Sequence, residues 1–109
     1  MSEPNQEKLQ EMQMAEQSLQ QMLMQKQAFQ MEFNETEAAL EELTKAGDDV
    51  FKIIGQLMIK TDKKKTQEEL ENKKKLIDLR IKSFEKQEKT FTEKLESLRE
   101  EVLSKEKAK

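Results

Sequence analysis

The chain has 109 residues, of which 39% are charged and 34% are hydrophobic, and its net charge is −3. A globular domain usually carries about 25% charged residues; with neither Trp nor Tyr in the chain, a compact domain with a large core is not expected. The absence of His and Cys excludes disulfides, thiol nucleophiles, cysteine-ligated zinc and the commonest general base.

Residues 1–46 are predicted to form the first of two long helices. Apolar residues recur there at alternating spacings of three and four, which is typical of a coiled-coil seam. The ten seam positions, eight of them apolar, are Met12, Ala15, Leu19, Met22, Lys26, Phe29, Phe33, Thr36, Leu40 and Leu43. Gly47 follows and is predicted to end the helix in a left-handed cap.

Residues 47–65 are predicted to form a β-hairpin connector. β-Branched and aromatic residues lie on both sides of Gly55-Gln56, and glycine at the first position of a two-residue turn suits a type II′ hairpin. Alternation along the chain places Val50, Ile54 and Met58 on one face, and Phe51, Ile53, Leu57 and Ile59 on the other.

Residues 66–109 are predicted to form the second long helix. Thr66 and Glu69 have the spacing of a capping box, in which each side chain accepts a backbone hydrogen bond at the helix start. A second seam follows, again with eight apolar residues in ten positions: Leu70, Lys74, Ile77, Ile81, Phe84, Glu88, Phe91, Leu95, Leu98 and Val102.

The charge distribution indicates that the two helices pack against each other. Residues 32–49 hold seven acidic residues and one basic residue, whereas residues 50–82 hold ten basic and five acidic residues. Folding back at the hairpin brings the acidic group Glu37, Glu41 and Glu42 beside the basic group Lys73, Lys74 and Lys75. The predicted fold class is therefore mainly α, a long antiparallel two-helix coiled coil joined by a central β-hairpin, and we treat residues 1–109 as one domain.

Each predicted seam contains a charged residue near its middle, Lys26 in the first helix and Glu88 in the second. Antiparallel pairing puts them in adjacent layers. We interpret them as an ion pair that fixes the register of the helices. The alternative is two unrelated seam defects.

The predicted hairpin has more apolar side chains than one coiled coil can cover. An isolated two-stranded hairpin is marginally stable in water, and exposed apolar edges favour pairing with another chain. We therefore predict that the hairpin mediates oligomerisation; the alternative is a small satellite core over the helix ends. The residues assigned to this role are Val50, Phe51, Ile53, Ile54, Gly55, Leu57, Met58 and Ile59.

The hairpin and its flanks resemble a known family. The stretch Val50-Phe51-Lys52-Ile53-Ile54-Gly55-Gln56-Leu57-Met58-Ile59-Lys60 is similar to the central hairpin of β-class subunits of prefoldin. So are Leu40-Glu41-Glu42-Leu43 before it and Glu69-Leu70, Lys74, Leu76, Leu79-Arg80 and Lys86-Gln87-Glu88 after it. The outer halves match only as coiled coil. A single hairpin fits the β class, because α-class subunits carry two.

The resemblance implies a hetero-hexamer with α-class and other β-class subunits. In that assembly the hairpins form a double β-barrel platform that carries six coiled coils. Their tips hold unfolded polypeptides and pass them to a group II chaperonin, cytosolic or archaeal, without using nucleotide. The sequence itself has no phosphate-binding loop, since its two glycines are isolated.

The free end of the coiled coil is the predicted client site, because helix ends fray and expose apolar groups. The six residues assigned to it are Leu9, Met12, Met14, Leu98, Val102 and Leu103. Met24 and Met31 also lie off the seam. They are either inconsequential or part of a flexible apolar surface that suits varied partners.

Other functions are weaker candidates. Paired carboxylates without a pocket do not indicate an enzyme, and no metal or cofactor is expected. Lys63–Lys65 and Lys73–Lys75 lack interleaved aromatic residues, so nucleic acid is not an expected partner. No apolar run is long enough to span a membrane, and we expect a cytoplasmic protein. The alternatives to a chaperone subunit are a structural coiled-coil tether or adaptor and a nucleic-acid-associated coiled coil.

Overall fold

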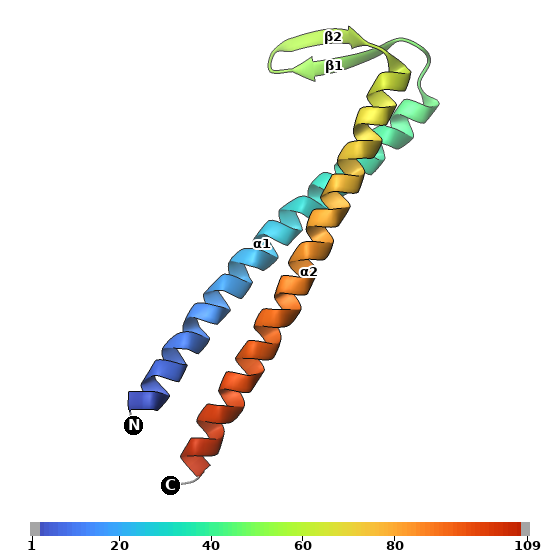
Figure 1. Ribbon diagram of the computed structural model, residues 1–109. Coiled ribbons are helices and arrows are strands. Elements are labelled where there is room, and N and C mark those ends of the chain that lie inside the picture. Colours follow the sequence, from blue (N-terminus) through green and yellow to red (C-terminus); the bar gives the residue numbers. More distant parts are fainter. Residues whose placement is uncertain (1–2, 108–109) are drawn as a thin grey trace. The chain divides into compact units, whose positions relative to one another are not determined.

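The computed structural model contains two long helices with a two-stranded hairpin between them in sequence (Figure 1). The elements are α1 (Glu3–Lys45), β1 (Val50–Ile54), β2 (Leu57–Thr61) and α2 (Lys63–Lys107). The structure describes residues 3–107, and the side chains of residues 5–104. The predicted order of helix, hairpin and helix is confirmed.

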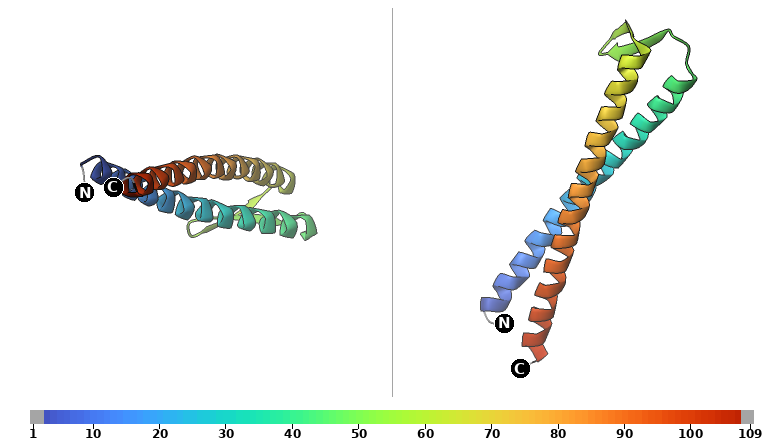
Figure 2. Two further views of the ribbon diagram at one scale, coloured as in Figure 1. Left: turned by 90° about the horizontal axis from the view of Figure 1, so that it is seen from below. Right: turned by 45° about the vertical axis from the view of Figure 1, so that its right-hand side comes forward.

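The chain divides into two compact units. The hairpin unit comprises residues 28–81, and the terminal unit comprises residues 1–27 together with residues 82–109. Within each unit a segment of α1 lies antiparallel to a segment of α2, as Figure 2 shows from two directions. The prediction that the whole chain is one domain stays a prediction.

Side-chain burial confirms the predicted coiled-coil seam. All twenty seam positions given above are buried or half-buried. The apolar residues that are most completely buried are Ala15, Met22, Leu43, Ile77, Ile81, Leu98 and Val102. Thr36 is a buried polar seam residue whose hydroxyl donates to the carbonyl of Glu32 at 2.8 Å, so its hydrogen-bonding requirement is met.

The predicted left-handed cap at Gly47 is wrong. Gly55 is the residue with a positive φ among those described, and Gly47 does not share that conformation. The last turn of α1 closes instead through the amide of Ala46, which donates to the carbonyls of Glu42 and Leu43 at 3.0 and 3.3 Å. The ammonium of Lys63 then donates a hydrogen bond to the carbonyl of Ala46 at 2.7 Å. A lysine from α2 therefore provides a hydrogen-bond donor at the end of α1, where a glycine cap would provide backbone amides.

The predicted capping box at Thr66 and Glu69 is also wrong, because α2 begins three residues earlier, at Lys63. Asp62 is the N-cap: its carboxylate accepts the amide of Lys65 at 3.2 Å, and its carbonyl accepts the amide of Thr66 at 2.9 Å. Aspartate is among the preferred N-cap residues.

Opposite charges meet across the helices of the hairpin unit, although only partly as predicted. The ammonium of Lys74 lies 3.9 Å from the carboxylate of Glu37, a pair from the two predicted groups. Lys73 contacts Glu32 instead, at 3.4 Å. Glu41 pairs with Lys45 one turn along α1, at 3.7 Å. Exposed carboxylates thus pair with whichever ammonium is near, on either helix.

Candidate functional site

The hairpin turns at Gly55-Gln56, with φ of +61° at Gly55 and a negative φ at Gln56. Positive φ at the first turn position alone is the type II′ pattern, and glycine is the residue that adopts it without strain. The predicted two-residue turn is confirmed. The flanking strands are rich in β-branched residues, which favour the pleated conformation.

The pairing of the strands corrects the predicted division of the hairpin into faces. Ile54 pairs with Leu57, and Ile53 pairs with Met58. Directly opposed residues share a face of an antiparallel sheet. One face therefore carries Val50, Ile54, Leu57 and Ile59, and the other carries Phe51, Ile53 and Met58. The prediction had placed Met58, Leu57 and Ile59 on the wrong faces.

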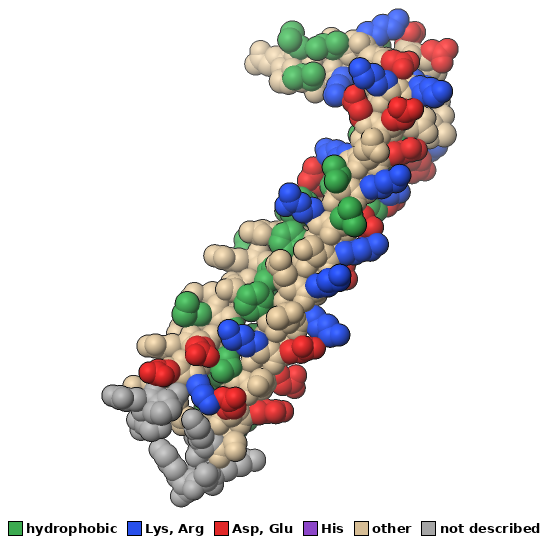
Figure 3. Space-filling model, viewed as in Figure 1, with side chains coloured by type: hydrophobic (Ala, Val, Ile, Leu, Met, Phe, Trp, Pro, Cys, Tyr) green, Lys and Arg blue, Asp and Glu red, His purple; other side chains and the backbone are tan. Residues whose placement is uncertain are grey.

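Both faces of the hairpin are open to solvent. Residues 51–60 are all exposed, and Ile53 on one face and Leu57 on the other reach 70% and 65%. Figure 1 shows the hairpin projecting away from the adjacent helix ends, and Figure 3 shows apolar side chains gathered on it. The sheet has two strands, so within residues 3–107 each strand has one edge without a neighbour. The satellite-core alternative is therefore wrong.

Polar contacts hold the base of the hairpin against the helices. Lys52 donates to the carboxylate of Glu69 on α2 at 3.2 Å. The hydroxyls of Thr61 and Thr66 are hydrogen-bonded at 3.1 Å across the start of α2. These contacts leave the turn and most of both strands unsupported, so the apolar surface is presented outward.

The turn yields a prediction. Gly55→Ala should destabilise the hairpin by about 1 kcal/mol, because a Cβ disfavours positive φ. Native-state hydrogen exchange of the strand amides should therefore accelerate by roughly fivefold. Gly47→Ala is the matched control: Gly47 lacks positive φ, and a Cβ there meets no atom within 4 Å. Equal exchange rates in the two variants would contradict the strain argument.

The helix ends remote from the hairpin in sequence lie together in the terminal unit. Lys8 of α1 and Glu101 of α2 form an ion pair there. Of the six residues predicted to bind clients, Leu98 and Val102 are buried in the seam and Met12 is half-buried. Leu9, Met14 and Leu103 are exposed, Met14 by 68%. The structure thus brings three of the six into packing and presents three to solvent; their role stays a prediction.

The two charged seam residues are in contact. The ammonium of Lys26 lies 3.1 Å from a carboxylate oxygen of Glu88, and both side chains are partly buried. Partial burial strengthens such a pair relative to a surface ion pair and makes an unpaired member costly. The contact supports the prediction that this pair fixes the register of the helices.

Replacing both members tests this prediction. Lys26→Leu or Glu88→Leu alone should lower the free energy of unfolding by about 1 kcal/mol by isolating a charge. The double variant should recover that stability but lose a unique register. A zero-length carbodiimide cross-link between Lys8 and Glu101, identified by mass spectrometry, reports the register. Glu41→Leu with Lys45→Leu removes an exposed pair within one helix and is the control. An undiminished cross-link in the Lys26–Glu88 double variant would contradict the role.

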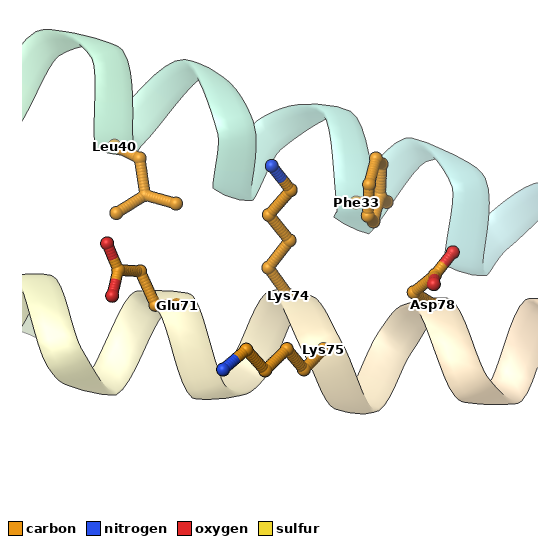
Figure 4. A pocket seen from close by; sticks show the side chains of 6 residues that line it. All are labelled: Phe33, Leu40, Glu71, Lys74, Lys75 and Asp78. Carbon is orange, nitrogen blue, oxygen red and sulfur yellow. The ribbon is translucent and has the colours of Figure 1, made fainter.

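A shallow pocket lies along the seam of the hairpin unit (Figure 4). Phe33 and Leu40 of α1 form its apolar side, and Glu71, Lys74, Lys75 and Asp78 of α2 form the charged side. Lys74 extends toward α1, with its ammonium 5.5 Å from the centre of the Phe33 ring. This cation–π contact explains how a lysine occupies a seam position. The pocket thus belongs to helix packing and gives no reason to infer catalysis.

Two exposed leucines of α2 had no role predicted from the sequence. Leu76 and Leu79 are exposed by 65% and 63% in the hairpin unit. The sequence could have indicated their exposure, since both lie outside the predicted seam.

Within the described part of the chain, no helix is long and apolar enough to cross a membrane, and no cluster of acidic side chains could hold a metal ion.

Comparison with known proteins gives consistent matches over most of the chain. A family model described as a prefoldin subunit matches residues 6–108. The prefoldin subunit beta of Thermococcus gammatolerans is 44% identical over 71 residues, covering 63% of this chain and 61% of that protein. That of Sulfurisphaera tokodaii is 40% identical over 73 residues, covering 65% and 58%. The matched stretch thus spans about three fifths of these curated relatives.

A solved structure is similar over nearly the whole fold. The crystal structure of the prefoldin beta subunit from Thermococcus strain KS-1 has a TM-score of 0.86 and 35% sequence identity. The similarity covers 94% of this chain and 92% of that one. Both helices and the hairpin are therefore included in one structural match.

Proposed function

Because this chain belongs to the prefoldin chaperone family as a β-class subunit, we propose that it is part of an ATP-independent holdase. The holdase binds unfolded polypeptides and transfers them to a group II cytosolic chaperonin. The observation that carries the assembly part of this proposal is the hairpin, whose two apolar faces are open to solvent.

The partners that best explain the hairpin are α-class and other β-class subunits in a hetero-hexamer. Their strands would continue the sheet at its two open edges and close it into a β-barrel platform, which removes edges altogether. Assembly would then bury both faces of the hairpin, the one with Phe51, Ile53 and Met58 and the one with Val50, Ile54, Leu57 and Ile59. Burial of each large apolar side chain contributes roughly 1.5–3 kcal/mol, which supports a stable assembly.

The client site that we propose is the free end of the coiled coil. Leu9, Met14 and Leu103 are exposed there, while Met12, Leu98 and Val102 become accessible when the last turns fray. A few side chains bind an unfolded segment weakly. Several coiled coils on one platform would raise the affinity through effective concentration, which suits a protein that must also release its client.

The proposal includes neither nucleotide use nor catalysis. The sequence lacks a phosphate-binding loop, and its glycines stand alone at positions 47 and 55. A chain without cysteine needs no oxidising compartment, which agrees with the cytoplasmic location that we propose. No nucleic-acid or membrane partner is proposed.

The main alternative is a structural coiled-coil tether or adaptor that binds no client. A tether does not need an apolar strand pair at its bend, so the exposed hairpin favours the chaperone subunit. Mixing the chain with candidate α-class subunits should give one discrete complex by light scattering. That complex should suppress aggregation of a denatured protein without ATP. A discrete complex that leaves aggregation unchanged would favour the tether.

A further inference from the structure

The solvent-facing side of α1 in the terminal unit has an unusual composition. Between residues 10 and 27, the positions opposite the seam are occupied by six glutamines and two methionines, all exposed. These eight residues, which we name the Gln–Met face, are Gln10, Gln13, Met14, Gln17, Gln20, Gln21, Met24 and Gln27. None of them carries a charge.

The equivalent side of α2 in the same unit is different. Six of its eleven described positions opposite the seam are charged: Lys82, Lys86, Lys89, Glu93, Glu96 and Glu100. The other five are Ser83, Thr90, Ser97, Leu103 and Ser104. In Figure 3, charged side chains crowd the α2 edge of the terminal unit, while uncharged ones predominate along α1. The outer side of a coiled-coil helix is ordinarily charged, so solubility alone does not account for α1.

The chemistry of the Gln–Met face suits an extended polypeptide. A glutamine amide both donates and accepts hydrogen bonds, so it can pair with the N–H and C=O groups of any backbone. Met14 and Met24 are exposed by 68% and 71%, and flexible thioethers adapt to apolar side chains of different shapes. An uncharged face is also complementary to uncharged, apolar client segments and repels neither acidic nor basic ones.

A helix of a second chain fits the face less well. Helix pairing needs apolar residues at alternating spacings of three and four, but Met14 and Met24 are ten residues apart with Gln17, Gln20 and Gln21 among the residues between them. From residue 10 to residue 27 the face measures roughly 25 Å at 1.5 Å per residue. An extended segment of about eight residues covers that length at 3.3 Å per residue.

We propose that the Gln–Met face is a binding surface for extended, unfolded polypeptide, distinct from the frayed helix ends. Its glutamines bind the client backbone, and its methionines, with the half-exposed Leu23 beside them, bind apolar client side chains. The inference rests on the proposed holdase function, which it extends from the tip along α1. It also gives a role to Met24, for which the sequence left two interpretations open.

Gln17→Glu with Gln21→Glu tests the face without changing its shape or helix propensity. The control is Gln67→Glu with Gln87→Glu, the same change at two exposed positions of α2. Each variant is assembled with an α-class subunit, and the complex is checked by light scattering. Binding is measured by fluorescence anisotropy with two permanently unfolded probes, reduced and carbamidomethylated lysozyme (basic) and α-lactalbumin (acidic).

For each probe, the control complex should bind with the same affinity as the unmodified complex. Gln17→Glu with Gln21→Glu should weaken binding of the acidic probe by roughly fivefold or more, because two neutral donors become anionic acceptors that repel it; binding of the basic probe should fall less. Met14→Gln with Met24→Gln leaves the face neutral and should weaken binding of both probes to a similar extent. If the unmodified complex binds neither probe, the holdase function fails. If it binds both and the face variants match the control, or if they change the mass of the complex, this inference is overturned.

Discussion

A chain carrying Phe51→Asp with Ile53→Asp should fail to assemble with an α-class subunit while keeping its helices. Both residues lie on one face of the hairpin and are exposed. Assembly would bury two carboxylates in an apolar interface, and their desolvation costs far more free energy than the missing apolar packing alone. We expect affinity for the partner to fall at least a hundredfold. Helical circular dichroism should change little, because the seam lies elsewhere.

The matched control for that variant is Leu76→Asp with Leu79→Asp. These leucines of α2 are as exposed as Phe51 and Ile53, so the change adds the same charges and removes similar apolar surface. Size-exclusion chromatography with light scattering should show the complex for the control and free subunits for the hairpin variant. A hairpin variant that still forms the complex would place the interface outside the strands.

Removing residues 1–14 and 98–109 should preserve the complex and abolish most of its protection of clients. The hairpin remains intact in the shortened chain, as do the seam residues from Ala15 to Leu95, so assembly should survive. The apolar groups at the free end of each copy of this chain are removed, and multivalency multiplies the resulting losses of affinity. Light scattering of a denatured protein diluted into intact or shortened complex measures the difference.

A point variant separates the end residues from the rest of α1. Leu9→Ser with Leu103→Ser removes two exposed side chains that lie outside both the seam and the Gln–Met face. It should lower protection part of the way toward the shortened complex. Full protection by both the shortened complex and this variant would show that clients bind elsewhere and that the tip assignment is wrong.

The coiled-coil seam was predictable from the sequence because its physical signal is strong and repeated. Burying one stripe of side chains requires apolar residues every three or four positions along both helices. The seam accommodates its polar members because they have partners: Thr36 bonds to a backbone carbonyl one turn away, and Lys26 contacts Glu88 on the other helix. Gly55 was equally informative, because a two-residue turn demands positive φ at one position.

The errors concern the pairing of residues across the turn and the ends of the helices. Counting alternate residues straight through the turn misassigned Met58, because a two-residue turn makes residues 53 and 58 partners and so reverses the alternation. The cap of α1 was misassigned because Lys63, a residue of α2, reaches the carbonyl of Ala46, a contact that no local cap motif reveals. The start of α2 was misplaced because the spacing of Thr66 and Glu69 was preferred to Asp62, whose carboxylate accepts the amide of Lys65.

The open edges of the hairpin also bear on how much of this protein a cell can tolerate. Each strand has an edge with no neighbouring strand among the described residues, and such edges are templates for indefinite strand addition. We therefore expect a copy made in excess of its partners to be prone to aggregation. Matched synthesis of the subunits would then protect the cell, a constraint on gene dosage set by ten residues of β-structure.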